Sequence, residues 1–152
     1  MRRDAARSDL SAREDLLWIV KVPKIVPVIA SIVFALVALA FVFYNAVWTA
    51  FVVSKRSEYT GFEDWQFAAF SNASLFWIVS FFIGISGLPL LIFKKTRRIC
   101  PFLMLSSTIA TGIAWGFYIS TVSESILETV WALILTTPLL VSTILLFYTN
   151  EL

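Results

Sequence analysis

The sequence predicts an all-α membrane protein, a bundle of four membrane-spanning helices that follows a short interfacial helix. Its composition is 59% hydrophobic and only 14% charged, whereas soluble domains carry about 25% charged residues. The apolar residues form four long stretches whose charged residues are confined to the ends. Backbone groups in hydrocarbon need internal partners, and these stretches lack the alternation of a β-barrel strand, so we expect helices.

The expected spans are Ile25–Val53, Leu75–Phe93, Ile99–Ser120 and Ile126–Tyr148. A bilayer core needs about 20 apolar residues in a helix, so the first span is long enough to tilt or to project beyond the membrane. The chain is thus divided into a cytoplasmic arm, residues 1–24, and a four-helix domain, residues 25–152.

The arm contains a capping-box pattern from Ser11 to Glu14, followed by apolar residues that include Trp18. Pro23 and Pro27 then interrupt the helical pattern. We expect a short helix at the cytoplasmic membrane surface, and a frayed tail is the alternative.

The basic residues are distributed unevenly. They gather in the arm (Arg2, Arg3, Arg7, Arg13, Lys21, Lys24) and in the second loop (Lys94, Lys95, Arg97, Arg98), while the first loop has Lys55 and Arg56. The positive-inside rule therefore predicts that both termini are cytoplasmic. An aromatic belt at the outer ends of the spans would agree with this orientation; its expected members are Trp48, Trp65, Trp77, Trp115 and Trp131. The expected location is the plasma membrane.

The first loop, residues 54–74, is aromatic and acidic, and we expect it to lie in the membrane interface with a surface helix from Glu63 to Phe70. The third loop, near Thr121–Ser125, is short enough to make the last two spans an antiparallel hairpin.

Small residues indicate where helices approach closely, because lipid gives helices no hydrophobic reason to associate. The third span repeats such residues every four positions, and Gly112 and Gly116 form a GxxxG motif. The helix face that carries this motif packs either on another helix of the same chain, which we expect, or on a partner protein. The residues assigned to helix packing are Thr108, Gly112, Gly116, Ser120, Ser80, Gly84 and Asn45.

The first span places a narrow seam of small and polar residues at Ser31, Ala35, Ala38, Asn45 and Thr49. An amide exposed to lipid costs a few kcal/mol, so we expect Asn45 to donate a hydrogen bond to a neighbouring helix. A ligand contact is the alternative.

Pro89 and Pro138 lie within the second and fourth spans and deprive the carbonyls of Ile85 and Ile134 of their partners. We expect static kinks, with gating hinges as the alternative. Threonine hydroxyls near Pro138 are candidates for local compensation.

The second loop combines Lys94, Lys95, Arg97 and Arg98 with Cys100. Its charges act as a topology determinant and favour anionic lipid headgroups, at about 1 kcal/mol for each basic residue. Cys100 is either a free thiol or a site of acylation.

The composition also excludes much chemistry. Without histidine and with one cysteine, the chain offers no zinc, copper, haem or iron–sulfur ligand set. The span interiors lack the charged groups of proton relays, ion-coupled transport and voltage sensing, and no nucleophile has a base nearby. We expect no enzyme activity, cofactor or nucleic acid partner.

The expected function is that of an accessory, assembly or scaffold subunit that acts through helix–helix contacts with a membrane-protein partner or a second copy. The alternative is a small oligomeric transporter or channel with an uncharged path lined by Ser, Thr and Asn.

Overall fold

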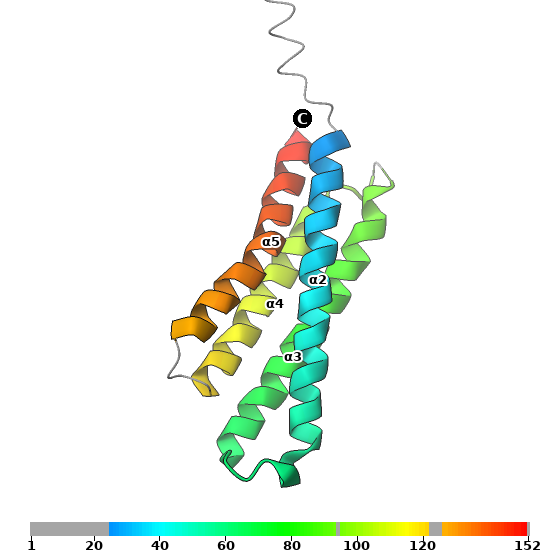
Figure 1. Ribbon diagram of the computed structural model, residues 1–152. Coiled ribbons are helices and arrows are strands. Elements are labelled where there is room, and N and C mark those ends of the chain that lie inside the picture. Colours follow the sequence, from blue (N-terminus) through cyan, green and yellow to red (C-terminus); the bar gives the residue numbers. More distant parts are fainter. Residues whose placement is uncertain (1–24, 94, 122–125, 152) are drawn as a thin grey trace, which may run out of the picture.

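The computed structural model describes residues 25–93, 95–121 and 126–151, and this part of the chain is helical without any strand (Figure 1). Its α-helices are α2 (Ile25–Ser54), α3 (Asp64–Gly87), α4 (Cys100–Thr121) and α5 (Ile126–Glu151), and its short 3₁₀ helices are η1 (Arg56–Glu58) and η2 (Leu88–Leu91). The interfacial helix expected in the arm lies outside the described residues.

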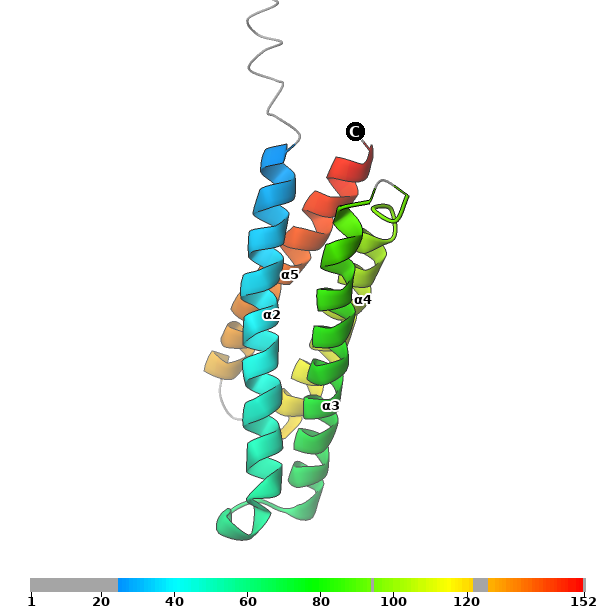
Figure 2. The same ribbon diagram turned by 90° about the vertical axis from the view of Figure 1, so that its right-hand side faces the viewer.

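The described chain holds four helices that are long and apolar enough to cross a membrane. They form an up-and-down bundle in which each helix contacts the next and α5 returns beside α2 (Figures 1 and 2). Large apolar side chains are exposed around the bundle, including Phe34, Phe82, Phe102, Leu133 and Ile144. So much exposed apolar surface is expected where the surrounding medium is lipid.

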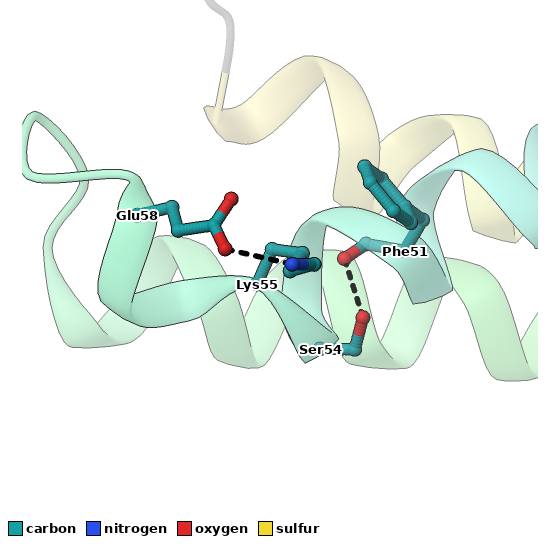
Figure 3. A network of polar contacts seen from close by, with 4 residues as sticks. All are labelled: Phe51, Ser54, Lys55 and Glu58. Atoms are coloured by element: carbon teal, nitrogen blue, oxygen red, sulfur yellow. Dashed lines mark hydrogen bonds and ion pairs between the residues drawn. The ribbon is translucent and has the colours of Figure 1, made fainter.

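Helix α2 ends at a turn that two side-chain contacts stabilise. The Ser54 hydroxyl donates to the Phe51 carbonyl at 2.7 Å, and Lys55 forms an ion pair with Glu58 at 2.7 Å (Figure 3). This turn and η1 form the α2–α3 loop end of the bundle, which projects beyond the ends of α4 and α5 (Figure 1).

The start of α3 differs from the expected span, because the helix begins at Asp64 rather than Leu75. The surface helix expected from Glu63 to Phe70 is instead the first part of α3. The Glu63 amide donates to Gln66 Oε1 at 2.7 Å, and Gln66 Nε2 donates to the Thr121 carbonyl at 3.2 Å. One glutamine thus caps α3 and joins it to the end of α4.

The two prolines have different effects. Pro89 lies in η2, which replaces the last turn of α3, because proline has no amide hydrogen to donate. Pro138 lies inside α5. The hydroxyls of Thr136 and Thr137 donate to Ala132 and Leu133 rather than to the carbonyl of Ile134.

The predicted seam of α2 is confirmed for its small and hydroxyl residues, which are buried: Ser31, Ala35, Ala38 and Thr49. Leu39, Val42, Ala46 and Val52 complete the buried face of this helix.

Two tryptophans expected in the aromatic belt, Trp77 and Trp115, are buried in the bundle. Trp77 is fully buried and Trp115 is 7% exposed, and their rings meet edge to face at 5.3 Å. Both pack against Tyr118, at 5.8 and 5.6 Å between ring centroids. Trp77 lies in the body of α3 and not near its end as expected, because α3 begins at Asp64 rather than at Leu75.

Candidate helix-contact site

A reciprocal pair of hydrogen bonds joins α2 to α5. The Ser31 hydroxyl donates to the Ser142 carbonyl at 3.1 Å, and the Ser142 hydroxyl donates to the Ser31 carbonyl at 2.9 Å. Both side chains are fully buried, and their oxygens lie 3.0 Å apart. The two backbones must therefore approach closely, which the small side chains allow.

The same geometry joins α3 to α4. The Ser80 and Ser107 hydroxyls each donate to the other residue's carbonyl at 2.8 Å. Thr111 Oγ1 lies 2.7 Å from Ser80 Oγ and extends the contact by one helical turn. These three side chains are buried, so the cluster is shielded from lipid and water alike.

Hydroxyl groups also join the other two neighbouring helix pairs. The Ser74 hydroxyl donates to the Ala46 carbonyl at 3.0 Å, from α3 to α2. Thr108 Oγ1 lies 3.3 Å from Thr143 Oγ1, between α4 and α5. Every neighbouring pair in the bundle is thus joined by a hydroxyl group.

Among the described glycines, Gly84 has the least space for a side chain, because side chains of α2 and α4 pack against it. A Cβ atom added there would lie 2.5 Å from Leu39 Cδ2 and 3.0 Å from Ser107 Oγ. Gly87 is close to the start of α4, and its added Cβ would lie 3.3 Å from Leu103 Cβ. Ser80 and Gly84, both predicted for helix packing, therefore lie one turn apart in the same contact.

The GxxxG face of α4 lies elsewhere. Gly112 and Gly116 are exposed, and a Cβ added at either would meet no heavy atom of the described residues within 4 Å. Ser120 is also exposed, and its hydroxyl donates to the Phe117 carbonyl of its own helix. The expectation that these glycines pack within the chain is wrong, because α4 turns Ser107, Thr111, Ala114 and Trp115 inward instead. Packing on a second molecule stays a prediction.

Asn45 does not hydrogen-bond to a neighbouring helix as expected. Its Nδ2 donates to the Phe41 carbonyl, one turn back in α2, at 2.8 Å. The side chain is half-buried, and Thr49 donates to the Asn45 carbonyl at 2.8 Å. A bond within its own helix satisfies the amide donor without any second helix.

The α3–α4 connection carries the remaining predicted residues. Lys95 and Arg98 are exposed, Arg97 is half-buried, and Lys94 lies outside the described residues. Cys100 is fully buried at the start of α4, and its Sγ would lie 3.8 Å from a Cβ added at Gly87. A thiol in this position packs as a small apolar side chain.

Sequence reasoning missed Ser107, Thr111 and Ser142 as contact residues. Each is a small hydroxyl residue inside an apolar span, and Ser107 and Thr111 share the four-residue spacing of Ser80 and Gly84. That spacing was the signal that could have found them.

The described residues include no group of three or more His, Cys, Asp or Glu side chains placed to hold a metal ion. The length and apolar composition of the four helices define the class of the chain: it is a multi-pass membrane protein whose described part is an all-helical bundle. Comparisons with protein families, with curated proteins and with solved structures find no significant match.

Proposed function

We propose that this protein is a non-catalytic subunit of a membrane complex, and that it binds a transmembrane helix of another protein on the outward face of α4. The observation that carries the proposal is the open GxxxG motif. A Cβ atom added at Gly112 or Gly116 would meet no heavy atom of the described residues within 4 Å, although glycines at this spacing allow helix backbones to approach closely.

The residues beside this motif favour a helix as the occupant. Ile109 and Ile113 are exposed next to the glycines, so the face has a shallow strip bordered by branched apolar side chains. A helix that entered this strip would gain close packing, whereas flexible lipid chains fill it less well.

The alternative, an oligomeric channel with a path lined by hydroxyl groups, has less support. The hydroxyls of Ser31, Ser142, Ser80 and Ser107 already donate to backbone carbonyls across the bundle. A solute or ion that moved between these helices would have to displace those bonds.

The proposed orientation has both termini and the α3–α4 connection on the cytoplasmic side of the plasma membrane. It rests on the basic residues of that connection and of residues 1–24.

Co-purification in mild detergent tests the proposed function. Gly112→Ile and Gly116→Ile should each remove the partner while the protein itself still folds, because neither glycine is needed inside the bundle. Val37→Ile is the control, because Val37 is exposed on α2, away from the outward face of α4, and this variant should retain the partner. A wild-type protein that purifies alone and moves solutes in liposomes would overturn the proposal, and loss of self-association in the glycine variants would make a second copy the occupant.

A further inference from the structure

An apolar groove lies between α2 and the η2 end of α3. It has a volume of about 490 Å³, which falls within the usual range for small-molecule sites. Its lining residues are all apolar: Val28, Ile32, Ile85, Leu88, Pro89, Leu91 and Ile92.

The groove exists because α2 and α3 separate toward this end of the bundle (Figure 2). Pro89 converts the end of α3 into a 3₁₀ turn, and the side chains of Ile85, Pro89 and Ile92 are exposed at the rim. The groove is therefore open on its outer side, where a bilayer would supply hydrocarbon chains.

Basic residues follow the last lining residue of the groove closely in sequence. The chain leaves the lining at Ile92 and folds back, as Thr96 Oγ1 donates to the Leu90 carbonyl at 3.0 Å. Lys95 and Arg98 follow Ile92 within six residues in sequence, on either side of Thr96, and both are exposed. Neither forms an ion pair with a described side chain.

The opposite end of the same helix pair provides an internal comparison. A second groove of about 340 Å³ there includes Ala50, Ser71 and Ser74 in its lining. The nearby cations Lys55 and Arg56 are already paired, with Glu58 and Asp64 respectively. Of these two grooves, the first is therefore the one whose apolar wall is followed in sequence by cations that form no ion pair with a described carboxylate.

We propose that the groove binds one anionic glycerophospholipid, with an acyl chain against Ile32 and Leu88 and the headgroup phosphate at Lys95 and Arg98. The apolar wall selects a hydrocarbon chain, and the two cations select negative charge, since each basic residue near an anionic headgroup favours binding. The site lies on α2 and α3, so it is independent of the proposed partner face on α4.

Native mass spectrometry of the full chain in detergent tests the proposal, with phosphatidylglycerol and phosphatidylcholine of the same chain length as probes. We expect one phosphatidylglycerol to be retained in preference to phosphatidylcholine. Lys95→Gln with Arg98→Gln should weaken phosphatidylglycerol binding roughly tenfold or more and remove the preference. Val28→Trp or Ile85→Trp should fill the groove and lower the retention of both lipids.

Matched control variants at the opposite end of the α2–α3 pair test whether the effect is specific to the first groove. Lys55→Gln with Arg56→Gln changes charge by the same amount, and Ala50→Trp fills the second groove; both should leave lipid retention unchanged. Circular dichroism of each variant verifies folding, and Ile85→Trp, at the exposed rim, serves if Val28→Trp misfolds. Equal loss in the controls, unchanged binding in both groove variants, or occupation by a partner helix instead of lipid would overturn the proposal.

Discussion

Ser31 and Ser142, separated by almost the whole described chain, each donate a hydroxyl hydrogen bond to the other's backbone carbonyl across the α2–α5 interface. Ser80 and Ser107 repeat this arrangement across the α3–α4 interface. Since hydrocarbon provides no competing partners, these bonds are directional contacts in an interface that apolar packing alone would leave unspecified. Measured interhelical hydrogen bonds of this kind contribute about 0.6 kcal/mol on average.

Removal of one serine from such a pair should destabilise the bundle modestly. We expect Ser31→Ala or Ser142→Ala to lower the free energy of unfolding by about 0.5–1.5 kcal/mol. The double variant should lose less than the sum of the two, because the pair acts as a unit. Reversible unfolding by a denaturing detergent in mixed micelles measures both effects. Ser106→Ala is the control, because its hydroxyl is exposed and bonds only within α4; an equal loss there would count against a role for the pair.

A bulky residue at Gly84 should be far more harmful than one at Gly112. A side chain at Gly84 would enter the space occupied by Leu39 and Ser107, and overpacking of this kind costs roughly 1–3 kcal/mol. Gly84→Leu should therefore lower the unfolding free energy by at least that amount, while Gly112→Leu leaves it nearly unchanged in the isolated protein. The same unfolding titration compares the two variants, and similar losses at both positions would show that α4 packs differently.

Trp77 should contribute to stability through its ring. It is fully buried, and its indole nitrogen has no hydrogen-bond partner among the described residues. Trp77→Ala should cost at least about 2 kcal/mol, since it leaves a large cavity. Trp77→Phe should cost less, because it retains a ring against Trp115 and removes an unpaired donor. Thermal unfolding measures these losses of stability. Trp131→Ala, at an exposed position, is the control. If it lost as much stability as Trp77→Ala, the buried placement of Trp77 would be contradicted.

The sequence was sufficient to predict the number and order of the long helices, because continuous apolar stretches in a chain this poor in charge have few other structures. It was misleading at the start of α3. There we expected a surface helix from Glu63 to Phe70 and a separate span from Leu75, because polar residues at 71, 72 and 74 interrupt the apolar pattern, yet α3 continues through them. The apolar residues Phe67 and Phe70, in the first part of α3, are buried against Val52 in the projecting end of the bundle.

The contact residues were predicted less well, for a geometrical reason. A GxxxG motif identifies a helix face that can pack closely, but it does not indicate whether that face points into the bundle. In α4 the face with Gly112 points outward, and the inward face has Ser107 and Thr111. Only the positions of α3 and α5 decide between these faces, and those positions depend on contacts distant in sequence, such as that of Ser80 with Ser107.

Cysteine labelling tests the proposed orientation, although the native thiol is unsuited to it. Cys100 is fully buried, so it should react with a maleimide slowly in the native protein and quickly after denaturation. In a Cys100→Ala background, Ser57→Cys and Arg98→Cys place thiols at exposed positions at opposite ends of the bundle. A membrane-impermeant maleimide should label Ser57→Cys in intact cells and Arg98→Cys only after permeabilisation, because the basic residues that remain still hold the α3–α4 connection inside. Labelling of Arg98→Cys from outside, with Ser57→Cys protected, would reverse the orientation and place the lipid-binding cations in the outer leaflet.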